Sequence, residues 1–183
     1  MVEGPPMIEV VIDSIRISLV SQHRIVLLRE VDSERQLPIW IGPCEADAIT
    51  IELQDVKVAR PLTQDLLKNV ITELGGTLSH VLIKELNESV FHARLFINME
   101  GEREPREIDC RPSDAIALAV RAKVPIFISE EVMDVAGVEP EPDMQEGSDD
   151  AEGADDIGPF DAFSDFLDTL DFDDFAGGDD ERP

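Results

Sequence analysis

The sequence contains few cysteines, few basic residues and no long apolar run, and each shortage excludes a class of protein. Only Cys44 and Cys110 occur among 183 residues, too few for the disulfide framework of a small secreted domain. No apolar stretch approaches the roughly 20 residues of a membrane-spanning helix, and the acidic start lacks the pattern of a secretory leader. We therefore expect a cytoplasmic protein that does not enter the membrane, with both thiols reduced.

Three catalytic signatures are also missing from the chain. It has no glycine-rich phosphate loop, no zinc-protease helix motif and no nucleophile elbow, which excludes those enzyme classes. The histidines at positions 23, 80 and 92 are scattered without metal-ligand spacing, so we do not expect them to be catalytic.

Charge is strongly and unevenly distributed. The chain has 15 basic and 41 acidic residues, a formal net charge of −26. Residues 139–183 alone contain 18 acidic residues and one basic residue, against 23 and 14 in residues 1–138. An acidic body repels a phosphate backbone at long range, so we do not expect avid binding of duplex DNA. Contact with nucleic acid would need a local basic patch or bridging divalent cations.

Strand and helix patterns are mixed without regular βαβ alternation, which predicts an α+β class. We expect a mixed, mainly antiparallel sheet with about three packed helices, followed by an acidic tail. Strands are predicted at 8–19, 24–31, 36–41, 77–85, 89–98, 106–110 and 126–128, with a bulge or bend near Asp13 and Trp40 in the core. The predicted organisation is a flexible lead (1–6), a folded domain (7–135), an acidic linker (136–158), a short amphipathic acidic helix (159–176) and a disordered end (177–183).

Two helix entrances combine an arginine, a proline and an acid. Arg111-Pro112 precedes Asp114 and an apolar run from Ala115 to Val120, which predicts a buried helix with a polar entrance. Asp109 lies just before it. Because an acid in the first turn also caps a helix, this stretch is either a well-capped joint or a polar site.

The second entrance is Arg60-Pro61, followed by Thr63 as the expected N-cap and Asp65 in the first turn. It opens a helix predicted over 64–74, which ends at two glycines. A further helix, predicted over 44–54, carries Glu45 on one stripe with Glu52.

Four segments in register resemble the bifunctional nuclease domain, a family found in bacteria and plants. The matching runs are Leu37-Pro38-Ile39-Trp40-Ile41-Gly42, Glu45-Ala46 with Ala48-Ile49, Arg60-Pro61-Leu62-Thr63 with Asp65-Leu66-Leu67, and Ile108-Asp109 with Arg111-Pro112-Ser113-Asp114-Ala115-Ile116-Ala117-Leu118-Ala119. The resemblance covers roughly residues 7–135. It implies a mixed α/β body, homodimers or higher homo-oligomers, and the degradation of RNA and DNA from which the family takes its name.

One position departs from the family pattern. Members often have histidine where this chain has Gln64, and an amide cannot replace a histidine as general base at neutral pH. Either this position is not catalytic or this member is impaired, and the sequence leaves both possibilities open.

The candidate site follows from what phosphodiester hydrolysis needs: an anion holder, a base or activated water, and stabilisation of the leaving oxygen. Arg60 and Arg111 are the candidate phosphate-binding residues. The candidate catalytic carboxylates are Asp109, Asp114, Asp65 and Glu45, and Asp109, Asp114 and Glu45 are also candidate ligands for Mg²⁺ or Mn²⁺. Helix capping and plain ion pairing remain the structural alternatives for these residues.

The tail offers a second hypothesis. Phe160, Phe163, Phe166, Leu167 and Leu170 recur at spacings of three and four among aspartates, which predicts an amphipathic acidic helix. It would dock on a protein partner or on its own domain, where it could compete with single-stranded RNA or DNA; a solvating tail is the alternative. The rival to a nuclease is therefore a non-enzymatic interaction or regulatory module.

Overall fold

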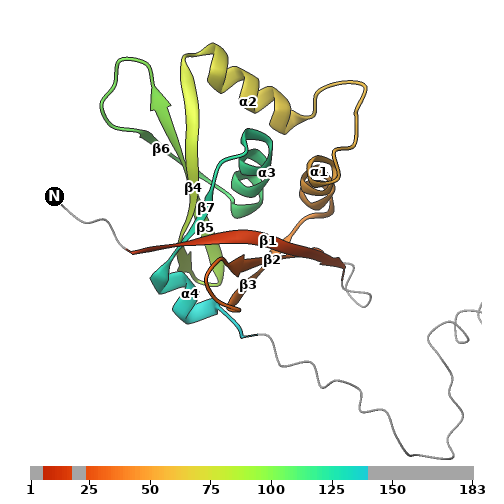
Figure 1. The fold of residues 1–183 in the computed structure, drawn as a ribbon, viewed down its shortest axis with the longest axis vertical. Coiled ribbons are helices and arrows are strands. Elements are labelled where there is room, and N and C mark those ends of the chain that lie inside the picture. The colour runs from red at the N-terminus through yellow and green to blue at the C-terminus, as the bar shows by residue number, and fades with distance from the viewer. Residues whose placement is uncertain (1–5, 18–23, 140–183) are drawn as a thin grey trace, which may run out of the picture. The chain divides into compact units, whose positions relative to one another are not determined.

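The structure, a computed structural model, describes residues 6–17 and 24–139, which form a seven-stranded sheet with helices packed on it (Figure 1). The strands are β1 (Met7–Ile17), β2 (Arg24–Glu30), β3 (Gln36–Ile41), β4 (Gly76–Asn87), β5 (Val90–Met99), β6 (Arg106–Cys110) and β7 (Ile126–Ser129). The helices are α1 (Pro43–Leu53), α2 (Thr63–Glu73), α3 (Pro112–Ala122) and α4 (Glu130–Ala136). None of these helices is long and apolar enough to cross a membrane.

The strand order is β3-β2-β1-β7-β4-β5-β6, and only β4 and β7 pair in parallel. β1, β2 and β3 form an antiparallel meander, and the β1–β2 register shifts between Ile12 and Ser14, at the predicted bulge. β4 and β5, which correspond to the consecutive strands predicted at 77–85 and 89–98, form an antiparallel hairpin. Its turn residues Glu88 and Ser89 have φ angles of 47° and 68°, as a two-residue type I′ turn requires. The α+β prediction is confirmed.

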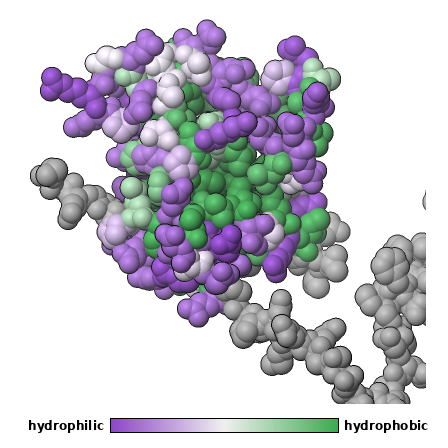
Figure 2. All heavy atoms as spheres, viewed as in Figure 1, coloured by the Kyte–Doolittle hydropathy of each residue, from purple (hydrophilic) through white to green (hydrophobic). Residues whose placement is uncertain are grey.

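Helix α3 lies at the centre of the core. It packs against β4 and β5, and α1 and α2 pack against α3 in turn. In Figure 1, α3 lies in the angle between the β1–β3 and β4–β6 parts of the sheet. Its residues Ala115–Ala119 are at most 1% exposed, which confirms the prediction of a buried helix. Figure 2 shows apolar side chains gathered in the middle of the same face, around β1 and α3, with hydrophilic side chains surrounding them.

Helix α4 is not predicted from the sequence. It has only seven residues and buries Val132 and Met133, too short a stretch to show helical periodicity. Start signals are nevertheless present: the Ser129 hydroxyl accepts the Val132 N–H at 3.4 Å, and Glu130 and Glu131 occupy the first turn.

Two local predictions are wrong. Trp40 is 62% exposed, because β3 is an edge strand and Trp40 alternates with Ile39 and Ile41, whose side chains face the core. Thr63 is the first residue of α2 and not its N-cap; Leu62 holds the cap position and provides no side-chain acceptor.

Most of the predicted tail lies outside the described residues, including the acidic linker from residue 140, the amphipathic helix at 159–176 and the end at 177–183. Residues 1–5 of the predicted flexible lead lie outside them as well. Within the described part, Ala136 ends α4 and Val138 bridges to Gln36 at the start of β3. After α4 the chain therefore returns to the edge strand of the sheet.

Candidate functional site

The entrance of α3 gathers three predicted site residues into one cluster. The Nε and Nη2 atoms of Arg111 donate to the two carboxylate oxygens of Asp114 at 2.7 and 3.0 Å. Nη1 of Arg111 lies 2.9 Å from Oε1 of Glu45. The hydrogen bonds from Asp114, and to a lesser degree from Glu45, raise the pKa of Arg111 above its ordinary value. The cluster thus contains one permanent cation between two acids, and the Arg111 side chain is 66% exposed to solvent.

Glu45 reaches this cluster because of the turn that joins β3 to α1. Gly42 is the N-cap and Pro43 the first helical residue, which places Glu45 in the first turn. A Cβ at Gly42 would collide with the Glu45 carboxylate. The glycine therefore leaves open the space in which the carboxylate approaches Arg111.

A pocket of about 270 Å³ lies between α2, β6 and α3, beside the cluster. Thr63 and Gln64 line it from the entrance of α2, Asp109 and Cys110 from the end of β6, and Asp114 from the first turn of α3. The two Arg-Pro helix entrances therefore converge, which the sequence leaves undecided. Gln64, the position that departs from the family pattern, lies in the same pocket as Asp109 and Asp114.

Asp109 and Cys110 contribute to this pocket differently. Successive residues of a strand point to opposite faces, so the Asp109 side chain leaves β6 on the side away from Cys110, directly across from Arg94 of β5. Asp109 is exposed, whereas Cys110 is partly buried. Burial, with smaller contributions from the charges of Asp114 and Asp109, raises the pKa of the Cys110 thiol to about 12. Cys110 is thus a protonated thiol at neutral pH, and both cysteines are free as predicted.

Asp65 does not bond to the Arg111 cluster in the described part of the chain. Its Oδ2 accepts the backbone N–H of Leu62 at 2.7 Å, so it caps its own helix, one of the alternatives left open by the sequence. Its Oδ1 accepts Nε of Arg121 at 2.8 Å. Asp65 therefore holds the first turn of α2, including Gln64, against α3.

Arg121, the buried partner in this pair, is not predicted as a site residue from the sequence. Its side chain is 2% exposed, and besides Asp65 it donates to the backbone oxygens of Ala117 and Ala48, each at 2.8 Å. One guanidinium thus joins α1, α2 and α3. The signal in the sequence is an arginine near the end of an otherwise apolar helix. Its partners could not be read from the sequence because they are distant along the chain.

Arg60, the other candidate phosphate-binding residue, is exposed and does not line the pocket. It makes no ion pair within 4.0 Å to another residue of the part that the structure describes. Of the two arginines that precede the prolines, only Arg111 therefore lies in the cluster.

No preformed metal cage is found within residues 6–17 and 24–139. No group of three or more His, Cys, Asp or Glu side chains is arranged there to hold an ion. Glu45 and Asp114 both pair with Arg111. The Asp109 side chain projects from the face of β6 opposite to Cys110. A divalent cation would therefore find at most one or two protein carboxylates here.

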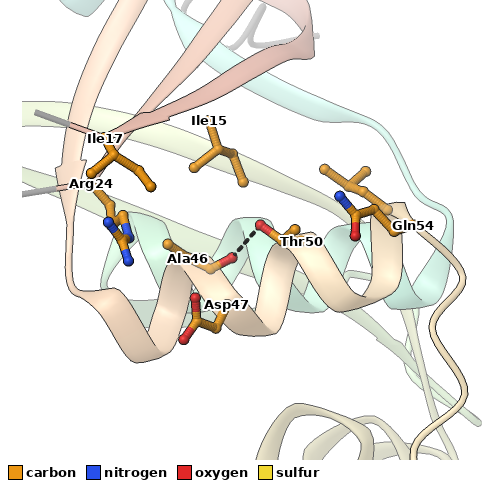
Figure 3. A pocket seen from close by; sticks show the side chains of 8 residues that line it. Ile15, Ile17, Arg24, Ala46, Asp47, Thr50 and Gln54 are labelled. Carbon is orange, nitrogen blue, oxygen red and sulfur yellow. Dashed lines mark hydrogen bonds between the residues drawn. The ribbon is translucent and has the colours of Figure 1, made fainter. Parts of the chain in front are cut away.

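A separate pocket of about 350 Å³ lies between β1, β2 and α1 (Figure 3). Ile15 and Ile17 line it on the sheet side, with Arg24 and Asp47 as its charged residues. The Thr50 hydroxyl already donates to the backbone oxygen of Ala46 at 2.8 Å. None of the predicted site residues lines this pocket, so we place the candidate site at the α3 entrance.

Comparison with known proteins identifies relatives of the chain. The sequence model described as Bifunctional nuclease domain matches residues 26–141. An uncharacterized protein of Mycobacterium tuberculosis strain H37Rv is 38% identical over 91% of this chain and 97% of its own length. Bifunctional nuclease 2 of Oryza sativa subsp. japonica is 35% identical over 58% of this chain, and bifunctional nuclease 1 of Arabidopsis thaliana 30% identical over 57%. The match spans 33% of the length of each of these plant relatives.

Proposed function

The chain belongs to the bifunctional nuclease domain family, and we propose that it is a nuclease that hydrolyses phosphodiester bonds in RNA and DNA. The observation that carries the proposal is the Arg111–Asp114–Glu45 cluster, which adjoins the pocket shared by Asp109 and Gln64. The plant relatives named bifunctional nucleases support the substrate class.

In this proposal Arg111 contacts the phosphate. A guanidinium has five N–H donors, and three of them are used on Asp114 and Glu45, which leaves two for phosphate oxygens. Exposed Arg60 would contact a neighbouring phosphate of the strand. Asp114, Asp109 and Glu45 are the proposed catalytic carboxylates, and Asp65 contributes by holding the turn that carries Gln64.

The proposal includes dependence of the hydrolysis on a divalent cation. Carboxylate oxygens are ligands that Mg²⁺ and Mn²⁺ prefer, and Mg²⁺ commonly uses one or two carboxylates together with substrate phosphate oxygens. Glu45 and Asp114 fit that role as a pair and do not fit a closed protein cage, while the Asp109 side chain leaves β6 on the face away from Cys110. When bound, such a cation would neutralise phosphate charge and lower the pKa of a coordinated water. We expect it to bind together with the substrate.

The second candidate is a non-enzymatic interaction or regulatory module of the same fold. It is favoured by one observation: Glu45 and Asp114 are paired with Arg111, and Asp65 with Arg121, as in a purely structural joint. Gln64 in place of the family's histidine points the same way. Such a module would act as a homodimer or higher homo-oligomer and recruit a protein partner through residues 159–176.

An assay on single-stranded RNA and DNA separates the two candidates. The purified full chain would be incubated with Mg²⁺, Mn²⁺ or chelator, beside Asp109→Asn, Asp114→Asn and the matched control Glu131→Gln on α4. We expect cleavage with a divalent cation, loss of at least tenfold in the two aspartate variants, and no change in the control. Cleavage that persists equally in all variants would remove the proposed site, and no cleavage under any condition would favour the interaction module.

A further inference from the structure

The side chain of Trp40 is unusually exposed for a large aromatic residue in a strand of the sheet. Its neighbours Ile39 and Ile41 are 3% and 7% exposed, whereas Trp40 is 62% exposed. It is the only tryptophan of the chain. A large aromatic side chain in contact with water is a common feature of binding surfaces, since its rigid face offers apolar area at low entropic cost.

Trp40 lines a pocket of about 290 Å³ at the end of β3. The other lining residues come from β3 and the turn that follows it (Ile39, Ile41 and Gly42), from the β4–β5 turn and the start of β5 (Ser89, Val90 and Phe91), and from the entrance of α3 (Arg111, Pro112 and Ser113). This lining contains one guanidinium, two hydroxyl groups and no carboxylate, in a chain with a net charge of −26. No acidic side chain belongs to this lining; Glu45 and Asp114 reach it only through their ion pairs with Arg111, which keeps two N–H donors for a ligand.

The Trp40 pocket shares Arg111 with the candidate site. Arg111 lines the Trp40 pocket, and its bound partner Asp114 lines the pocket that contains Gln64 and Asp109. One ion pair thus contributes a residue to each of the two pockets. A strand that crosses this pair would bring a nucleotide to Trp40 and the adjoining phosphate to Arg111.

We propose that Trp40 is a stacking platform for an unpaired base of single-stranded nucleic acid, with the adjoining phosphate at Arg111. This inference rests on the proposed nuclease function and names the form of its substrate. Stacking on an aromatic ring needs no positive charge and tolerates any base, so it suits an acidic protein that acts on both RNA and DNA. Bases of a duplex are not free to stack on a protein ring, and the platform therefore selects single strands.

The single tryptophan makes its own fluorescence the direct probe. The full chain would be titrated at fixed salt, with chelator present, with a short single-stranded DNA, an abasic strand of equal length and the corresponding duplex. We expect quenching by the single strand only. Binding of a labelled strand would then be compared between the native chain, Trp40→Phe, Trp40→Leu and the control Leu74→Ala, at the exposed apolar residue that follows α2. Trp40→Leu should weaken binding roughly ten- to a hundredfold, Trp40→Phe much less and Leu74→Ala not at all.

Each opposite result is informative. Equal quenching by the abasic strand, or unchanged binding by Trp40→Leu, would overturn the stacking platform. A fluorescence change that follows protein concentration without nucleic acid would also overturn it, because the face would then be an interface between copies. Base-dependent quenching without cleavage under any cation would retain the platform and reject the nuclease. Cleavage with an unchanged KM in Trp40→Leu would retain the nuclease and reject the platform.

Discussion

The two Arg-Pro helix entrances use the same residue types in different ways. At α3, Arg111 pairs with Asp114 of the following turn and with Glu45, and the arginine stays exposed. At α2, Asp65 pairs with Arg121 from the far end of α3, and the arginine is buried. The first entrance presents its cation to solvent, whereas the second uses its acid to fix three helices together.

Spacing explains the difference. Arg111 and Asp114 are three residues apart, a separation at which side chains meet at the start of a helix. Arg60 and Asp65 are five apart, and Asp65 instead accepts the Leu62 N–H and the Arg121 guanidinium. Arg111 also pairs with distant Glu45 and stays 66% exposed, whereas Arg121 is 2% exposed, so burial and not pairing alone commits an arginine to the fold.

The largest predicted effect is on the long-range pair. Replacing Arg121 by Met would remove the buried guanidinium that donates to the Asp65 carboxylate and to the backbone oxygens of Ala48 and Ala117. Breaking a buried pair from one side is strongly destabilising, and we expect a loss of about 3 kcal/mol in the free energy of unfolding. Urea denaturation would measure it, with Asp65→Asn and the double variant completing a cycle. Additive losses in that cycle would mean that the two side chains do not act as a pair.

The exposed pair should behave differently. Arg111→Gln removes the partner of Asp114 and Glu45, yet both acids can then be solvated, so we expect a loss below about 1 kcal/mol. Arg106→Met on β6 is the matched control, because it removes another exposed arginine, paired with Glu102. Nuclease activity should fall in Arg111→Gln and not in the control. A loss of stability as large as that of Arg121→Met would show that Arg111 is also committed to the fold.

Local signals account for what the sequence predicts correctly. The bulge near Asp13, the hairpin and the apolar run of α3 each follow from the order of neighbouring residues. The ion pair between Arg111 and Asp114 was one of the alternatives, because its partners are three residues apart. These features need no knowledge of which elements become neighbours.

The remaining features depend on tertiary neighbours. The alternation of Ile39, Trp40 and Ile41 places Trp40 on the opposite face of β3 from its neighbours, but it does not say whether another element covers that face. Arg121 and Asp65 are 56 residues apart, and the pocket shared by Gln64 and Asp109 joins two segments that are also distant along the chain. Such contacts follow from the packing of α2 against α3, which no local pattern specifies.

The smallest predicted effect is a difference in the alkylation rates of the two thiols, one near each helix entrance. The experiment leaves the fold unchanged. Cys44 is exposed and lines a pocket with Thr63 and Gln64 at the α2 entrance, whereas Cys110 precedes the α3 entrance and has its thiol pKa raised to about 12. The thiolate is the reactive form, so iodoacetamide at pH 8 should alkylate Cys44 first and leave Cys110 protonated and unlabelled. Mass spectrometry would measure the label at each site, with urea-unfolded protein as the control in which both react. Labelling of Cys110 as fast as Cys44 in the folded chain would mean that the α3 entrance opens to solvent more than this structure has it.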